Sequence, residues 1–168
     1  MATFTEHLRA RGEVGVAALL AERPDLAAPP PATLRALSAR AANRVSLDRA
    51  LGTVDAVVLH LLEAALALHG VAGRGPLTLA DLTAATGSSP SDAGTAATVA
   101  LRLALLWTPD GTVEGAPGTP GAATVLAPAP GLDEVLGPYP AGLGPALRQA
   151  LGRRSPQGLA RLAADLGL

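Results

Sequence analysis

The chain has 168 residues, with 13 basic side chains against 14 acidic ones and a formal net charge of −1 at pH 7. It contains no cysteine, which excludes a disulfide framework, a thiolate metal site and a cysteine nucleophile. Alanine and leucine dominate the composition and only three residues are aromatic, so the sequence favours helices and argues against a β-sandwich or barrel.

Short helices are predicted at the start of the chain. Residues 3–22 read as one or two helices with a break at Gly12. Three consecutive prolines then form an extended spacer that leads into a helix over residues 32–42. Ser46 is expected to cap a further short helix over residues 47–51.

Three longer helices are predicted in the middle of the chain. The stretch 54–69 is nearly all apolar, which is typical of a buried helix. Two further helices are expected over 79–86, closed by Gly87, and over 90–103. Each of the three has a candidate N-cap residue before it: Thr53, Thr78 and Ser89.

A β-hairpin is predicted to follow these helices. Residues 105–107 are apolar, residues 109–111 form a Pro-Asp-Gly turn signal, and residues 112–114 can return antiparallel. Residues 115–130 are rich in Gly, Pro, Ala and Thr and read as a loop, or as a wing with a flexible tip. The order helix, helix, turn, helix, hairpin is typical of a winged helix-turn-helix.

The last part of the chain repeats an earlier pattern. A helical turn is expected over 132–136 and a helix over 143–151, and Ser155 resembles another N-cap. Residues 79–87 and 159–167 both read L-A-x-L-x-A-x-x-G. This match indicates that a second helix-turn-helix begins near the end of the chain, and that the chain is a fragment of a longer protein.

These observations predict a mainly α fold in which N-terminal helices pack on a winged helix-turn-helix with a short β-hairpin wing. The expected divisions are an N-terminal helical segment over 1–52, a winged-helix-like domain over 53–151, and the start of a truncated second helix-turn-helix over 152–168.

No constellation of catalytic residues is recognisable, so we expect no enzyme activity, no cofactor and no metal. His60 and His69 are nine residues apart on one predicted helix, which puts them on opposite faces. The sequence has no phosphate-binding loop and no nucleophile motif. No run of 18 apolar residues predicts a membrane span, and charges near the N-terminus do not fit a signal peptide, so a cytoplasmic location is expected.

The charge distribution bears on nucleic-acid binding. Residues 1–50 sum to +2, residues 51–147 to −6 and residues 148–168 to +3. The predicted helix over 90–103, which would read DNA in a winged helix, has Arg102 as its only cation. Phosphate contacts depend on cations. This helix is therefore expected to be unsuited to DNA.

Five arginines are the candidates for any contact with nucleic acid. Arg148, Arg153 and Arg154 form the densest basic cluster in the sequence. Arg40 and Arg44 are four residues apart and are expected to share one helix face.

Several runs resemble a known family. These are residues 23–26 and 29–31, the run 37–44, and the stretch 132–145, which contains L-G-P-Y-P-A-G-L-G-P. They are similar to the N-terminal region of the actinobacterial helicase-associated proteins, which contain a helicase C-terminal domain and are often encoded beside an XPB-type DNA helicase. The resemblance implies winged-helix-like modules in a DNA-repair setting, with an XPB-type helicase or other domains of the parent protein as partners.

The expected function is that of a non-enzymatic N-terminal interaction module of a helicase-associated DNA-processing or repair protein, acting mainly through protein contacts. Two alternatives stay open. The chain is a DNA-binding winged-helix module of a repair or transcription factor, or it is a structural cap that keeps neighbouring domains soluble. Weak DNA binding is compatible with the sequence, whereas a membrane or small-molecule ligand is not expected.

Overall fold

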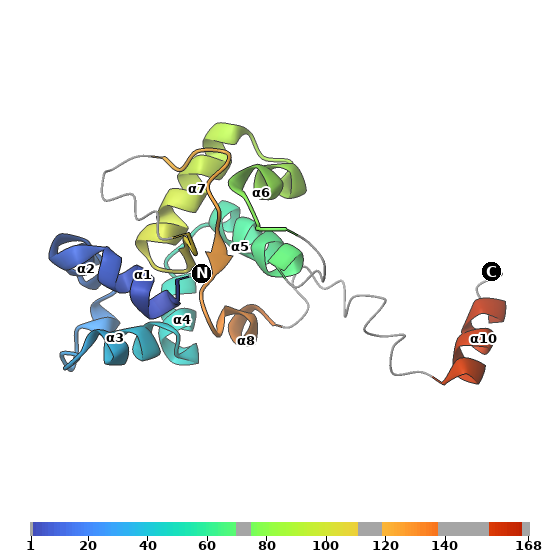
Figure 1. Cartoon of the computed structure of the whole chain (residues 1–168), viewed down its shortest axis with the longest axis horizontal. Coiled ribbons are helices and arrows are strands. Elements are labelled where there is room, and N and C mark those ends of the chain that lie inside the picture. Colours follow the sequence, from blue (N-terminus) through green and yellow to red (C-terminus); the bar gives the residue numbers. More distant parts are fainter. Residues whose placement is uncertain (1, 70–74, 111–118, 138–154, 166–168) are drawn as a thin grey trace.

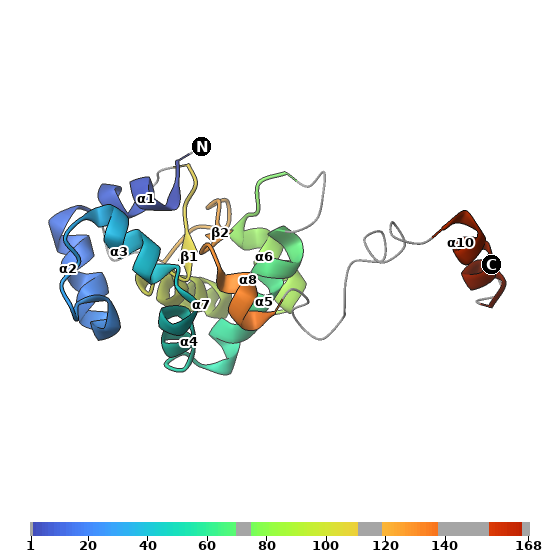
Figure 2. The ribbon, with the colours of Figure 1, turned by 90° about the horizontal axis from the view of Figure 1, so that it is seen from below.

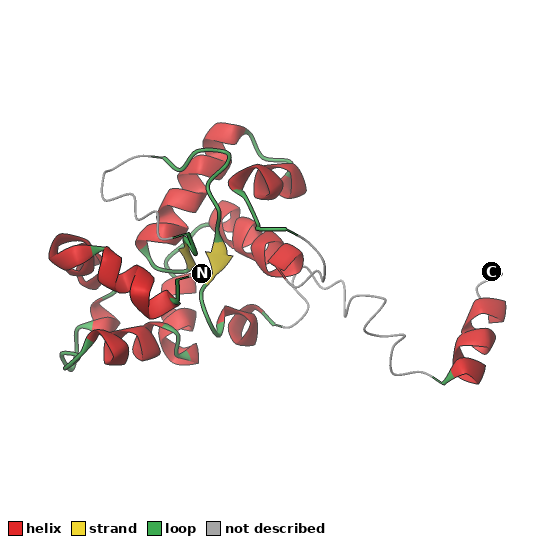
Figure 3. Ribbon diagram, in the orientation of Figure 1, coloured by secondary structure: helices red, strands yellow, loops and turns green. Residues whose placement is uncertain are grey.

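The computed structural model describes residues 2–69, 75–110, 119–137 and 155–165 of the chain (Figures 1 and 3). These residues are mainly helical, with one short two-stranded antiparallel sheet. The mainly α class predicted from the composition is confirmed. The predicted helix over 143–151 lies outside the described residues.

Short helices form the N-terminal layer, as predicted. The second helix begins at Gly12, whose φ of 64° marks the break after the first helix, and a single turn of 3-10 helix follows the two. The predicted cap at Ser46 is wrong, because the Asn43 side chain accepts from the Val45 N–H and starts the last helix earlier. The elements are α1 (Phe4–Ala10), α2 (Gly12–Glu22), η1 (Pro24–Leu26), α3 (Leu34–Ala41) and α4 (Arg44–Leu51).

The next three helices are α5 (Ala56–His69), α6 (Leu79–Thr86) and α7 (Pro90–Arg102). The caps predicted at Thr78 and Ser89 are present. The cap predicted at Thr53 is wrong, because its hydroxyl donates to the carbonyl of Ala50 at 2.7 Å. Asp55 caps the start of α5 instead, because its carboxylate accepts from the Val58 N–H at 2.9 Å.

Helices α5, α6 and α7 pack on one another (Figure 1). The buried face of α7 consists of small residues: Ala93, Gly94, Ala96, Ala97 and Ala100. Side chains this small let helix axes approach closely, and the larger residues come from the facing helix. On α5 these are Val58, Leu61 and Leu62, and Ala65 completes its buried face. The same core continues into the N-terminal layer, because one cluster of buried apolar residues runs from Phe4 to Leu132.

The sheet pairs β1 (Leu106–Trp107) with β2 (Ala127–Pro128) in antiparallel register. The predicted return strand at 112–114 lies outside the described residues. Of the two alternatives for residues 115–130, a loop throughout is wrong, because residues 127–128 form β2. Backbone hydrogen bonds extend the pairing, since Leu126 N–H donates to the carbonyl of Leu77 at 2.8 Å. The segment before α6 therefore runs beside the segment before β2.

Two further helices end the described chain, α8 (Leu132–Leu136) and α10 (Pro156–Asp165). Gly131 precedes α8 with a φ of 79°, and a Cβ atom there would lie 2.8 Å from the carbonyl oxygen of Ala42. The backbone before α8 thus touches the turn between α3 and α4. Only glycine fits this approach, since both the left-handed backbone and the space exclude a side chain.

We expect Gly131→Ala to lower the free energy of unfolding by about 2–4 kcal/mol, because it combines a left-handed alanine with a backbone clash. Urea denaturation followed by circular dichroism measures the change. Gly121→Ala is the matched control, because no atom lies within 4 Å of a Cβ placed there. Equal stability of both variants would contradict the close approach.

Candidate functional site

Helix α7 corresponds to the helix predicted over residues 90–103, which we expected to be unsuited to DNA. Ser89 caps it, and Ser91, Asp92 and Thr95 are exposed on its first turns. The Thr95 hydroxyl donates to the carbonyl of Ser91 at 3.0 Å, so it is already hydrogen-bonded within the helix. These exposed first turns therefore offer small polar groups and one carboxylate, and no positive charge.

The one cation of α7 is already paired. The guanidinium of Arg102 lies 2.6 Å from a carboxylate oxygen of Glu22, at the end of α2, and its Nε donates to the same oxygen at 2.7 Å. This pair is partly exposed, so it contributes little to stability. Its consequence is electrostatic, because the charge of Arg102 is balanced by that of Glu22.

Two more arginines from the N-terminal layer cover the C-terminal end of α7. Arg11 donates to the carbonyl of Leu101, and also to the carbonyl of Arg102 at 3.3 Å. Arg23 donates to the carbonyl of Leu103 at 3.1 Å. The last carbonyls of a helix lack partners within the helix and carry a partial negative charge. Both guanidinium groups supply these carbonyls with hydrogen-bond donors and a positive charge.

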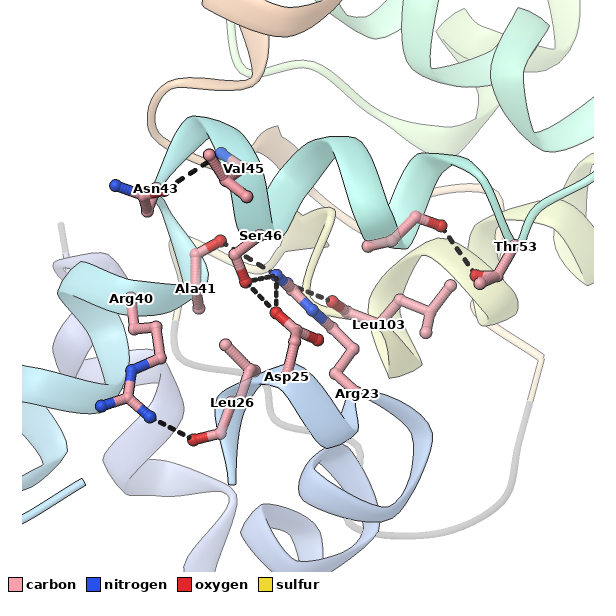
Figure 4. A network of polar contacts seen from close by, with 11 residues as sticks. Arg23, Asp25, Leu26, Arg40, Ala41, Asn43, Val45, Ser46, Thr53 and Leu103 are labelled. Atoms are coloured by element: carbon pink, nitrogen blue, oxygen red, sulfur yellow. Dashed lines mark hydrogen bonds and ion pairs between the residues drawn. The ribbon is translucent and has the colours of Figure 1, made fainter. Parts of the chain in front are cut away.

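Arg23 is the centre of a buried polar network (Figure 4). Only 1% of this residue is exposed. Its guanidinium donates to the Ser46 hydroxyl at 2.6 Å and to the carbonyl of Ala41, and that hydroxyl donates in turn to the Asp25 carboxylate. Arg23 and Asp25 form an ion pair at 3.8 Å. Burial lowers the pKa of Arg23, and the Asp25 carboxylate opposes this shift.

A second junction lies between α1 and β1. His7 is buried, and its Nε2 accepts from Arg11 Nε at 3.3 Å, while its Nδ1 lies 3.3 Å from the Thr108 hydroxyl. Because Nε2 accepts, the neutral ring carries its proton on Nδ1. Trp107 stands edge-on to both Phe4 and His7, with ring centroids 6.0 Å apart in each case. Burial, and secondly the charge of Arg11, lower the pKa of His7 to about 4.

The structure separates the arginines that the sequence grouped. Arg40 lies in α3 and Arg44 in α4, so they do not share one helix face as predicted, because a turn at residues 42–43 breaks the helix between them. Arg40 donates to the carbonyl of Leu26 at 3.0 Å and to that of Pro29, and holds the turn after η1. Arg44 is exposed.

The other three candidates, Arg148, Arg153 and Arg154, lie outside the described residues. Sequence reasoning missed the arginines that hold the structure together, Arg11 and Arg23. The signal for Arg23 was the Arg-Pro-Asp sequence, in which a proline turn places an acid two residues after the base.

The described residues contain no group of three His, Asp or Glu side chains placed to hold a metal ion. Within the same residues, no helix is long and apolar enough to span a membrane. Comparison of the chain with models of protein families, with curated proteins and with solved structures gives no match.

We expect Arg23→Met to lower the free energy of unfolding by about 3–5 kcal/mol, because the change leaves Asp25 and several carbonyl groups buried without their partner. Urea denaturation at pH 7 measures the loss. Arg49→Met is the control, since Arg49 is an exposed arginine of α4 and its replacement should change stability by less than about 0.5 kcal/mol. Similar values for the two variants would contradict a structural role for Arg23.

Stability should fall as the pH drops from about 6.5 to about 4, because unfolded chains protonate His7 in this range while the folded chain resists it until its pKa of about 4. The His7 contribution to the loss between pH 7 and pH 5 is about 2 kcal/mol. Urea denaturation at both pH values measures it. His7→Gln should remove this part of the pH dependence, whereas His60→Gln, which alters an exposed histidine, should keep it. An unchanged pH dependence in His7→Gln would refute the assignment.

Proposed function

We propose that the chain is a non-enzymatic interaction module built on a winged helix-turn-helix, and that it acts through protein contacts. The winged-helix assignment is supported by the order of the elements along the chain, which is α5, an extended segment, α6, α7, β1 and β2. In that assignment the extended segment before α6 is the first strand, and its Thr78 forms a bridge with Val125 beside β2. Helix α7 then takes the place of the recognition helix.

The protein-contact role is supported above all by the lack of unpaired cations on α7. A recognition helix offers Arg, Lys, Asn or Gln to base edges. The exposed residues at the start of α7 are Ser91, Asp92 and Thr95, and the cation at its end, Arg102, is paired with Glu22. Without free cations the helix releases no counterions from DNA, which removes the main source of affinity.

Contacts from elsewhere in the chain also occupy α7. Arg11 and Arg23 cover its C-terminal carbonyls. Near its other end, a Cβ atom placed on Gly94 would lie 2.4 Å from a methyl carbon of Thr119, so the segment that leads into β2 lies directly on the helix. These contacts favour a helix that serves as a packing surface. An XPB-type helicase as the partner, and a cytoplasmic DNA-repair setting, rest on the resemblance described above.

Binding of labelled single- and double-stranded DNA, followed by fluorescence anisotropy at low and near-physiological salt, tests this proposal. We expect no saturable binding by the unmodified chain. Asp92→Arg combined with Thr95→Arg should create salt-dependent binding, because it places cations on the exposed start of α7. Asp48→Arg combined with Val45→Arg adds the same charge to exposed positions of α4 and should bind at least about tenfold more weakly.

Two results would overturn the proposal. Binding by the unmodified chain that weakens steeply with salt would favour the DNA-binding alternative, and loss of that binding in Arg44→Ala with Arg49→Ala would assign it to the exposed arginines of α4. Equal binding by the two arginine-added variants would contradict the position of α7 in a winged helix. Titration with an XPB-type helicase tests the partner, and an apolar contact should persist at high salt.

A further inference from the structure

Helix α1 lies on the outer side of the N-terminal layer, beside α3 (Figure 2). Two residues one turn apart join it by polar side-chain contacts to the end of β1 and the end of α7: His7 within the helix and Arg11 at its C-cap. His7 is 3% exposed, and its Nδ1 faces the hydroxyl of Thr108, which follows β1. Arg11 donates to the carbonyls of Leu101 and Arg102. The two residues therefore link α1 to two other elements.

This link requires His7 to be neutral. The Nε2 atom of His7 accepts from the Nε–H of Arg11 at 3.3 Å, and only an unprotonated ring nitrogen can accept. A proton on Nε2 removes this acceptor and places a second positive charge against the guanidinium, at a site that is removed from water. Protonation therefore weakens the contacts of α1 with β1 and with α7 together.

No carboxylate of the described residues compensates a positive charge on His7. Burial, and secondly the charge of Arg11, lower the pKa of His7, and no acid raises it. The other charged residues of α1 and of the elements packed around it are bonded elsewhere or exposed: Glu6, Arg9, Glu13, Glu22, Arg35, Arg40, Arg102 and Asp110. Arg11 is thus the charged group that a protonated His7 would meet.

Helix α1 is also built to move as a unit. The left-handed backbone of Gly12 separates it from α2, so a rotation there displaces α1 without unwinding α2. The buried apolar side chains of α1 are Phe4 and Leu8, whereas α5 and α7 bury apolar faces of their own. Local opening of a short element can therefore precede unfolding of the rest.

We propose that α1 is an acid-released latch, which detaches from β1 and α7 when His7 takes up a proton, while the rest of the fold stays closed. Release uncovers Phe4 and Leu8, which are 5% and 0% exposed when α1 is attached. The latch thus exposes an apolar surface at low pH that is buried at neutral pH. This inference does not depend on the proposed function.

Proton linkage gives the direction and the size of the effect. In the released helix His7 has the ordinary histidine pKa of about 6.5, whereas in the attached helix its pKa is about 4. Attachment is therefore strongest above about pH 6.5 and weakens as the pH falls toward about 4. The ratio of released to attached α1 should rise about 20-fold between pH 7 and pH 5.

Hydrogen exchange of the full chain at pH 7 and pH 5, followed by mass spectrometry, tests the proposal. After correction for the pH dependence of the chemical step, the protection of the α1 amides should fall about 20-fold. The amides of α5 should stay better protected than those of α1 at both pH values, because the core remains closed.

Two variants assign the effect to His7. His7→Gln has a side chain that can accept from Arg11 but does not titrate, so the fall in protection should shrink to about twofold or less. His60→Gln is the matched control, because it alters an exposed histidine of α5 and should keep the full fall. NMR titration of the His7 ring protons in the unmodified chain needs no variant and should give a midpoint below about 5.5.

Each measurement has an outcome that contradicts the latch. A His7 midpoint near the ordinary value of about 6.5 would show that attachment does not require the neutral ring. Equal protection of the α1 and α5 amides at pH 5 would show that α1 leaves only when the whole fold opens. The same fall in protection in His7→Gln as in His60→Gln would show that another group controls the release.

Discussion

The burial of one guanidinium group is the constraint on which the described fold depends. Arg23 is a strong base that is removed from water, and the free energy lost with its hydration must be offset by acceptors at fixed positions. These acceptors belong to η1, α3, α4 and the end of α7. The requirement is mutual, because each of these elements also has a carbonyl, hydroxyl or carboxylate group that would be left without a partner.

This constraint defines how the N-terminal layer relates to α7. Arg11, Arg23 and Glu22 all reach the last turn of that helix, from one short stretch of chain. Their contacts are polar and directional, whereas the contact between α5 and α7 is apolar and relies on small side chains. The helix is therefore held at its end by charge and along its length by packing. The first turns of the helix remain exposed.

The sequence was most informative where the structure depends on neighbouring residues in the chain. The caps at Thr78 and Ser89 and the break at Gly12 follow from residues within one turn of each other. Where adjacent polar residues compete, as Asn43 does with Ser46 and Asp55 with Thr53, local rules do not say which one serves as the cap.

Contacts between residues far apart in the chain could not be predicted from local sequence rules. β2 contains a proline in a Gly- and Pro-rich stretch, and it pairs with residues of β1 that lie 20 and 22 positions earlier in the chain. Arg23 finds acceptors 18, 23 and 80 residues further on. An arginine in sequence reads as a surface residue, and nothing local reveals that distant carbonyls surround it. The extent of α7 was therefore predicted from its sequence, but the arginines that cover its end were not.

Trp107 is the only tryptophan of the chain, and it lies where α1 meets β1. Its indole N–H donates to the carbonyl of Pro128, and its ring faces both Phe4 and His7. An indole in this position changes its emission when the polarity around it changes. The molecule thus contains its own optical reporter for the attachment of the N-terminal helix, readable without a label and without interference from a second tryptophan.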